Sequence, residues 1–333
     1  MTPGPSASEG TARYAARFPE YRDFFRVVEG LTVSSLGLGT YLGAPDEETD
    51  RRYSEAAQAA FRSGINFFDT AINYRHQRSE RALGEALSGA AREELVICTK
   101  AGFLTPGAVP PSLSAADVVG GMHSMAPDFL ADQIERSRTN LRVETIDVFY
   151  LHNPETQLNF VAREEFDRRL HAAFMRLEEL AAKGRIRYYG TATWDGYRQP
   201  DQLSLADVAE IAREAGGDGH HFRFIQLPFN LGMVEAYTNK PDNVLAAAAR
   251  EGIHVIASMS LMQARVIGCM PEAVAELLPG LETDAQRAIQ FTRSTPGIAV
   301  ALAGMSRAEH VRDNLGVAAV APAPREQYEQ FFE

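Results

Sequence analysis

The chain has 333 residues, of which 45% are hydrophobic and 23% charged, as in an ordinary globular protein. Its 44 acidic residues outnumber 33 Lys and Arg and give a net charge of −11, which excludes the positive field that binds nucleic acid or an anionic membrane surface. No apolar run approaches the ~18 residues that span a bilayer, and the first eighteen residues lack the apolar stretch of a secretion signal. We therefore expect a cytoplasmic protein without nucleic-acid or membrane partners.

Residues 1–12 are small and polar and include several Pro and Gly. A segment of this composition buries too little apolar surface to order itself. The sequence therefore predicts a disordered N-terminal tail over 1–12 and one folded domain over 13–333.

The rest of the chain alternates short apolar runs with amphipathic helical stretches. The runs are rich in β-branched and aromatic residues, as in strands covered on both faces. They begin near Leu36, Ile65, Val96, Ile146, Arg187, Phe224, His254 and Ile298. Helical periodicity is clearest over 49–63, 129–141 and 166–183, and shorter over 205–213, 244–250 and 308–315. Eight strand-then-helix units predict an α/β fold, a single-domain (β/α)8 TIM barrel.

A doubly wound open sheet is the competing architecture. It is disfavoured because no G-x-G-x-x-G motif follows the first strand: Gly37 and Gly39 are followed by Gly43, one position too late. Two connections, 101–127 after the third strand and 259–284 after the seventh, are too long for simple turns. Since they leave the carboxyl ends of strands, where barrel enzymes bind ligands, we expect a lid and a cofactor clamp, with floppy insertions as the alternative.

Four polar residues follow three consecutive predicted strands. Asp69 ends the second strand and Tyr74 lies in its loop, Lys100 ends the third, and His152 ends the fourth. Each alone has an ordinary structural explanation, such as a helix cap or a satisfied core histidine. Because neighbouring strands lie ~4.8 Å apart, all four side chains can meet at one rim of a barrel. The set therefore predicts a catalytic site.

The chemistry that this set supports is proton transfer to a carbonyl oxygen. Tyr74 is a weak acid whose pKa a nearby Lys100 ammonium would lower toward the working range. Asp69 supplies the counter-charge that a buried Lys100 needs, and a neutral His152 can donate an N–H to the same oxygen. No side chain supplies hydride, so a nicotinamide or similar cofactor must.

These residues resemble the aldo-keto reductase family over roughly residues 30–317. The matching motifs are Gly39-Thr40-Tyr41, Phe68-Asp69-Thr70-Ala71 with Tyr74, Ser79-Glu80 with Leu83-Gly84, Thr99-Lys100 and Leu151-His152. The resemblance implies a barrel that binds extended NADP(H) without a Rossmann domain. It assigns Tyr74 as general acid, Lys100 and Asp69 as its tuning pair, and His152 as the group that orients the carbonyl.

The resemblance also implies a cofactor site. Its residues would be Gly39, Thr40, Asp69, Thr193, Gln226, Ser260, Leu261, Gly304, Ser306, Arg307, His310 and Asn314. Gln226 matches the family's carboxamide-binding Gln and Asn314 its adenine contact. Ser306 is expected to cap a helix whose N-terminus holds phosphate. Relatives often place a Lys and an Arg, which bind the 2′-phosphate of NADP(H), at the positions that Gly304 and His310 occupy here. Arg307 is expected to substitute for them, so the resemblance favours NADP(H), with NAD(H) as the alternative.

The nicotinamide clamp departs from the family pattern. Thr193 replaces an amide in Gly190-Thr191-Ala192-Thr193-Trp194, and one hydroxyl of the usual pair is missing at Ala192. Ser258 stands where the family often has the Tyr that stacks on the nicotinamide, so Trp194 or Phe229 would have to compensate. The substrate pocket is expected to involve Tyr41, Phe103 and Trp194.

The leading hypothesis is an NAD(P)(H)-dependent oxidoreductase that interconverts an aldehyde or ketone, sugars included, and its alcohol. The altered clamp motivates a second hypothesis, a regulatory or scaffold subunit of the same fold with little catalytic activity. A third makes Lys100 a Schiff-base nucleophile. The small-molecule substrate is the expected partner, and no ligand spacing in the sequence indicates a metal site.

Overall fold

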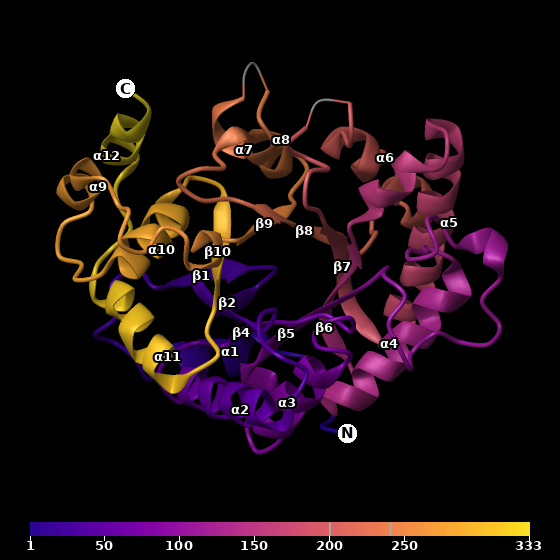
Figure 1. Ribbon diagram of the computed structural model, residues 1–333, viewed down its shortest axis with the longest axis horizontal. Coiled ribbons are helices and arrows are strands. Elements are labelled where there is room, and N and C mark those ends of the chain that lie inside the picture. The colour runs from indigo at the N-terminus through magenta and orange to yellow at the C-terminus, as the bar shows by residue number, and fades with distance from the viewer. Residues whose placement is uncertain (200, 240–241) are drawn as a thin grey trace.

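A closed parallel barrel forms the centre of the protein, in a computed structural model that describes residues 1–199, 201–239 and 242–333. The strand order around the barrel is β10-β3-β4-β5-β6-β7-β8-β9 (Figure 1). The strands are β3 (Leu36–Gly39), β4 (Phe67–Asp69), β5 (Val96–Ala101), β6 (Ile146–His152), β7 (Ile186–Ala192), β8 (Phe222–Pro228), β9 (His254–Ser258) and β10 (Ile298–Gly304). The predicted (β/α)8 barrel is confirmed, and the doubly wound sheet is excluded.

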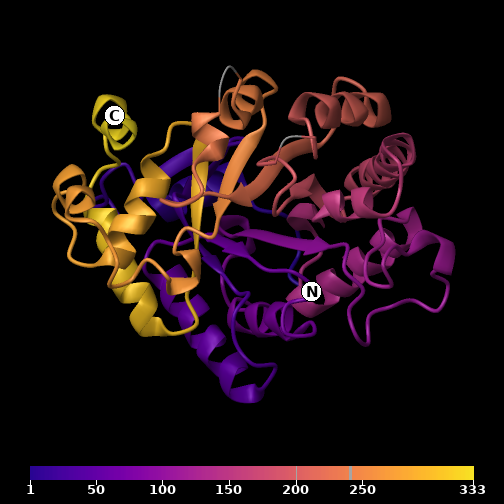
Figure 2. The same cartoon turned by 45° about the horizontal axis from the view of Figure 1, so that its top comes forward.

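Helices surround the strands on the outside of the barrel (Figures 1 and 2). They are α2 (Glu47–Arg62), α3 (Arg78–Ala86), α4 (Pro127–Leu141), α5 (Arg163–Ala182), α6 (Leu205–Gly216), α7 (Glu235–Thr238), α8 (Val244–Arg250), α9 (Glu272–Leu277), α10 (Asp284–Ser294), α11 (Ala308–Asn314) and α12 (Arg325–Glu329). Local sequence explains the ends of several. Asp46 caps α2 by accepting from the Thr49 N–H at 2.8 Å, and Pro127 opens α4. No helix in the described residues is long and apolar enough to cross a bilayer.

The apolar core has two layers, as both faces of the strands are covered. The larger layer lies between strands and helices and includes Phe149 and Phe174. The smaller layer fills the barrel interior, where Cys98 and Tyr150 are fully buried. Because side chains alternate along a strand, Cys98 and Lys100 share one face of β5, and both point inward as their parity predicts.

The amino end of the barrel is closed by an antiparallel hairpin that the sequence reading did not include. Its strands are β1 (Phe25–Val28) and β2 (Leu31–Ser34). Val28, Leu31 and Val33 belong to the same buried cluster as the residues of the barrel interior. The barrel floor is therefore sealed.

The N-terminal segment differs from the disordered tail expected over 1–12. Helix α1 (Ser8–Ala15) is packed on the protein, and Tyr14 within it is fully buried. The Ser6 N–H donates to Asp147 Oδ1 at 2.7 Å, and Thr2 bridges to Val143. Small residues here allow close approach instead of disorder, since a Cβ on Gly10 would lie 2.5 Å from the Glu93 carbonyl oxygen.

Both long connections lie at the carboxyl end of the barrel, as expected. The connection after β5 folds back on itself where Phe103 pairs with His123. The connection after β9 contains the short helix α9, and Met259, Met262, Gln263 and Ala264 within it have positive φ.

Candidate active site

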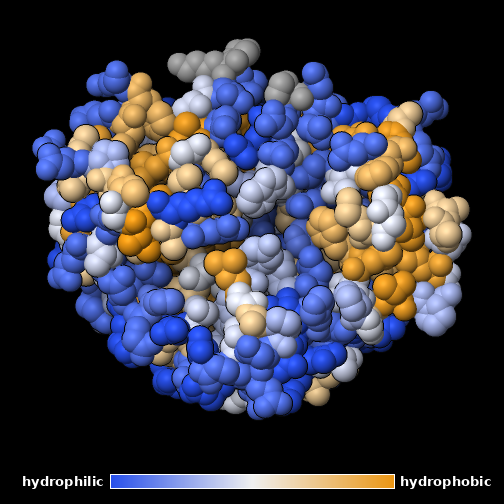
Figure 3. Space-filling view, in the orientation of Figure 1, coloured by the Kyte–Doolittle hydropathy of each residue, from blue (hydrophilic) through white to orange (hydrophobic). Residues whose placement is uncertain are grey.

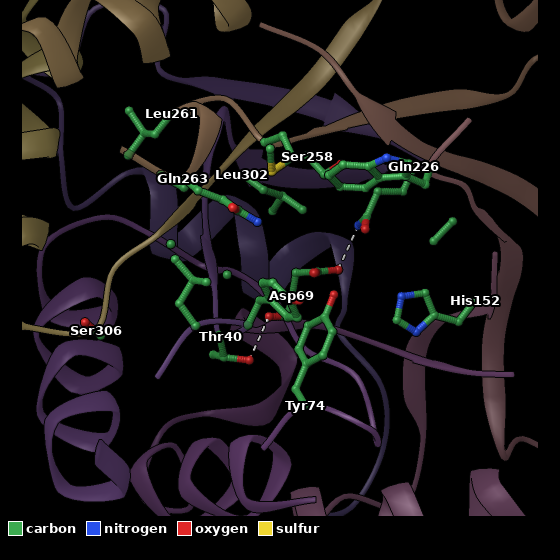
Figure 4. A pocket seen from close by; sticks show the side chains of 18 of the residues that line it. Thr40, Asp69, Tyr74, His152, Gln226, Ser258, Leu261, Gln263, Leu302 and Ser306 are labelled. Atoms are coloured by element: carbon green, nitrogen blue, oxygen red, sulfur yellow. Dashed lines mark hydrogen bonds between the residues drawn. The ribbon is translucent and has the colours of Figure 1, made fainter. Parts of the chain in front are cut away.

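A cavity of about 690 Å³ opens at the carboxyl end of the barrel. Figure 3 shows the hollow at the centre of this face, and Figure 4 shows the side chains around it. The strand ends that carry Asp69, His152 and Gln226 contribute to its walls. This is the rim where the four candidate catalytic residues were predicted to meet.

A buried ion pair lies below the cavity. Lys100 Nζ is 2.5 Å from Asp69 Oδ1 and donates to the Thr70 carbonyl oxygen at 2.8 Å. Lys100 is completely buried and Asp69 is 4% exposed, so each charge depends on the other. Gln226 Nε2 donates to the second Asp69 oxygen at 2.9 Å (Figure 4). The predicted pairing of Asp69 and Lys100 is present in the structure.

Lys100 is unsuited to the Schiff-base role. Burial lowers its pKa, but the groups around it, Asp69 first among them, raise it by more in total, and the net pKa is raised. A Schiff base needs a neutral, accessible amine. The structure therefore contradicts the third hypothesis.

Tyr74 points into the cavity next to Asp69 (Figure 4). Its ring centroid lies 5.0 Å from Lys100 Nζ, 5.0 Å from the Tyr41 ring and 5.8 Å from the His152 ring. Burial raises the pKa of Tyr74, and the Lys100 charge lowers it by less, so the net pKa is above its ordinary value. The sequence predicted the direction of the lysine effect but not the larger cost of burying a phenolate.

His152 presents a neutral imidazole to the same space. Burial, the nearby Lys100 charge and then His123 hold its pKa well below the ordinary value. Its ring meets the Phe103 ring edge-on at 5.2 Å. An uncharged imidazole can donate one N–H to an oxygen, and the neutral form agrees with the sequence-based expectation for His152.

Most of the residues expected to hold the cofactor line the cavity. These are Gly39, Thr40, Asp69, Thr193, Gln226, Leu261, Gly304, Ser306 and His310. The three substrate candidates, Tyr41, Phe103 and Trp194, also line it.

Three cofactor candidates lie outside the lining. Ser260 and Asn314 are buried, and Arg307 is exposed. Arg307, not Ser306, is the N-cap of α11, and it makes no side-chain cap hydrogen bond. The helix begins at Ala308, as its periodicity predicted, but the residue before it is Arg307, so the expected Ser306 cap is wrong.

The cavity wall contains polar atoms that lack protein partners among the described residues. Thr193 Oγ1, Asn73 Oδ1 and His152 Nδ1 are buried without a hydrogen bond, and Ser260 Oγ behind the wall is in the same state. Unsatisfied polar groups are costly unless a ligand or water meets them. With the Gln226 amide, they form a donor and acceptor set that fits an amide-bearing, polar cofactor.

Several lining residues were missed at the sequence level. Asn73, Asn153, Met259 and Gln263 line the cavity. Asn73 and Asn153 directly adjoin Tyr74 and His152, which is the signal that could have identified them. Among the described residues, no group of three or more His, Cys, Asp and Glu is arranged to hold a metal ion.

The closed parallel barrel, with a buried Lys–Asp pair next to a Tyr at its carboxyl end, defines the class of the protein as a (β/α)8 barrel with a polar cavity at that end. The sequence model of the Aldo/keto reductase family matches residues 35–267, which is more than half of the chain. The protein belongs to the aldo/keto reductase family. The resemblance stated from its motifs is confirmed.

Individual proteins similar to this chain share between 19% and 30% of its residues over the compared regions. A D-threo-aldose 1-dehydrogenase from a Pseudomonas species is 30% identical over 178 residues, which are 48% of this chain and 50% of that protein. The chain thus matches about half the length of this curated relative. An aldo/keto reductase from Klebsiella pneumoniae, solved with NADP and acetate, has a TM-score of 0.67 at 20% identity, covering 93% of this chain and 94% of that one.

A holo aldo-keto reductase from Bacillus halodurans has a TM-score of 0.69 at 19% identity and covers 94% of this chain and 95% of its own. At these identities the two solved structures establish the fold.

Proposed function

We propose that the protein is an NADP(H)-dependent oxidoreductase that interconverts a carbonyl compound and its alcohol, with Tyr74 as the proton donor. The observation that carries the proposal is the Lys100–Asp69 pair below Tyr74, beside the neutral His152. Family membership supports it, because the motif resemblance assigns these four residues the family's catalytic roles. NAD(H) is the alternative cofactor.

The residues that would hold the cofactor line the cavity. Thr193 and Gln226 line the cavity and would bind the nicotinamide carboxamide, whereas Gly304, Ser306 and His310, at and after the end of β10, would bind the phosphate-bearing part. The bound cofactor supplies the hydride that no side chain can supply. Trp194, which is 42% exposed and lines the cavity, would cover the nicotinamide, whereas Phe229, the other expected candidate, is fully buried and does not line the cavity.

In the reduction, the side chains of the protein bind the carbonyl oxygen of the substrate and protonate it. Tyr74 donates its hydroxyl proton to the developing alkoxide, and the Lys100 ammonium stabilises the phenolate left behind. His152 donates an imidazole N–H to the same oxygen and fixes its direction. In alcohol oxidation the same groups act in reverse, with the Tyr74 phenolate as base.

The substrate we propose is a polar aldehyde or an aldose. Asn73 and Asn153 line the same cavity as Tyr41 and Trp194. Sugars offer both hydroxyl groups and apolar C–H faces, so mixed amide and aromatic walls suit them. The Pseudomonas relative, a D-threo-aldose 1-dehydrogenase, supports the same class.

Trp194 allows cofactor binding and turnover to be measured separately, because it is the only tryptophan of the chain. We expect Tyr74→Phe to reduce turnover of an aldehyde and aldose panel by at least ~100-fold, the scale of a lost general acid. The Kd for NADPH, measured by quenching of Trp194 emission, should stay within about twofold of wild type. Tyr188→Phe, in the amino-terminal half of β7, is the control and should leave both quantities unchanged. Undiminished turnover in Tyr74→Phe would refute the assignment.

The altered clamp supports one other candidate function, a cofactor-binding regulatory or scaffold subunit. Ser258 lines the cavity and brings no aromatic ring to it, and Thr193 brings no amide. Tight NADPH binding with no hydride transfer to any member of the carbonyl panel would favour this candidate over the enzyme.

A further inference from the structure

We propose that His123 is a positioning residue that fixes His152 and Phe103, the wall of the cavity that receives the carbonyl group. The inference rests on the proposed function, because it concerns how His152 is held for that reaction. His123 comes from the long connection after β5 and is fully buried. It does not line the cavity, so it acts through its neighbours.

Both ring nitrogens of His123 have partners. Nε2 is 2.8 Å from the backbone carbonyl oxygen of His152, and Nδ1 is 2.9 Å from Gln157 Nε2. A carbonyl oxygen only accepts and an amide NH2 only donates, so Nε2 carries the hydrogen and Nδ1 accepts. Burial lowers the pKa of His123 to about 4, and the imidazole is therefore neutral in this tautomer at neutral pH.

The contact continues outward to a charged residue on α5. Gln157 Oε1 accepts from an Arg169 guanidinium N–H at 2.9 Å, which fixes the orientation of the Gln157 amide. Gln157 is buried in the turn Pro154–Asn159 after β6, and Arg169 also pairs with Glu165. The chain of hydrogen bonds thus joins the connection after β5 to the end of β6 and to α5.

Phe103 is held by the same residue. The Phe103 ring meets the His123 ring at 5.2 Å and 85°, and the His152 ring at 5.2 Å and 87°, so it stands edge-on between them. Gly102 precedes it because space is short: a Cβ there would lie 2.6 Å from the His152 oxygen and 2.7 Å from His123 Nε2. Loss of the His123 ring would free both Phe103 and the carboxyl end of β6.

Displacement on this side of the cavity should affect chemistry more than cofactor binding. The cofactor residues Gln226, Gly304 and Ser306 lie on β8, at the end of β10 and just after it, whereas His123 contacts the connections after β5 and β6. A reacting group moved by ~1 Å can lose on the order of 100-fold in rate. A general loss of folding would weaken both functions together.

The test compares His123→Leu with His123→Gln, whose amide N–H can reach the place of Nε2. We expect His123→Leu to lower kcat by at least ~10-fold with the Kd for NADPH within about twofold of wild type, and His123→Gln to restore most of the loss. His171→Leu is the control, a half-buried histidine of α5 outside the cavity lining, and should leave kcat unchanged. Wild-type kcat in His123→Leu, or equal losses of kcat and NADPH affinity, would overturn the proposal.

A second measurement separates this inference from the proposed function. NMR of protein with labelled histidine side chains should show that the His152 ring signals move in His123→Leu and return toward wild type in His123→Gln. Unchanged His152 signals in His123→Leu overturn the positioning role whatever the activity. Absence of wild-type turnover with these shifts present overturns the proposed reaction and leaves the contact between the two histidines established.

Discussion

Lys100 is a charged residue with no exposure to water, and the carboxylate of Asp69 compensates its charge. Removing one member of a buried pair leaves the other charge uncompensated, which costs more than the pair contributes. The same pair sits below Tyr74, so stability and catalysis depend on one contact.

We expect Lys100→Met to lower the free energy of unfolding by ~3–5 kcal/mol, in addition to abolishing turnover. Lys183→Met is the matched control, because Lys183 is 61% exposed and lies 4.0 Å from Glu179 in a surface pair. Such pairs contribute ~0–1 kcal/mol. Urea unfolding followed by Trp194 fluorescence measures both variants, and similar losses in the two would contradict the buried-pair argument.

The raised pKa of Tyr74 gives the two reaction directions opposite pH dependence. Reduction needs the protonated phenol, so its kcat/KM should stay constant through neutral pH and fall only as pH rises past the ordinary tyrosine value of ~10. Oxidation needs the phenolate and should rise with pH across the same range. Steady-state profiles in both directions test this, and a reduction rate that falls with a midpoint near neutrality would contradict it.

At the scale of elements, the barrel strands were predictable because each is a short apolar run followed by a turn. Helix α10 was not, since it is buried almost throughout yet contains Gln286, Gln290 and Arg293. Arg293 is fully buried and donates to Ser35 Oγ, Gln290 Oε1 and the Val317 carbonyl oxygen. Hydrogen-bond partners that are distant in sequence satisfy these polar groups. A local sequence pattern does not reveal such partners, so it does not predict that the helix is buried.

In the candidate site, too, some residues could be predicted from local sequence and others depend on tertiary contacts. Asp69, Tyr74, Lys100 and His152 could be predicted because strand ends and family motifs locate them. His123 could not, because the role proposed for it depends on a contact with the backbone of His152, 29 residues away in sequence. The pKa direction of Tyr74 was also beyond sequence reasoning, since it depends on how completely the barrel encloses the hydroxyl.

Helix α1 provides a test of the N-terminal segment. A Cβ at Gly10 would lie 2.5 Å from the Glu93 carbonyl oxygen, whereas a Cβ at Gly89 meets nothing within 4 Å. We expect Gly10→Ala to destabilise the protein by ~1–3 kcal/mol, because the helix must move away from its neighbour. Gly89→Ala should change the free energy of unfolding by less than ~0.5 kcal/mol. A disordered segment would instead make both changes equally small in urea unfolding.

The whole molecule should lose stability in mild acid because two histidines are buried neutral. The folded-state pKa of His123 is about 4 and that of His152 is also lowered, while unfolded histidines have pKa values of ~6.5. Between these values the unfolded chain binds more protons, so the free energy of unfolding decreases as pH falls.

The lowered pKa of His123 alone decreases the free energy of unfolding by about 3 kcal/mol as pH falls from 7 to 4. Urea unfolding at several pH values in that range should show a shallower decrease for His123→Gln than for wild type. Parallel curves for the two proteins would show that His123 is protonated normally in the folded state.

The first residues of the chain are hydrogen-bonded to the barrel, and this contact fixes the side of the protein on which a partner fused to Met1 would lie. The Thr2 N–H donates to the Arg142 carbonyl oxygen at 2.6 Å, beside the start of β6 and therefore at the end of the barrel away from the cavity. A purification tag or surface tether joined at Met1 would thus leave the mouth unobstructed. Immobilised molecules would present their openings outward, toward a flowing solution of reactants.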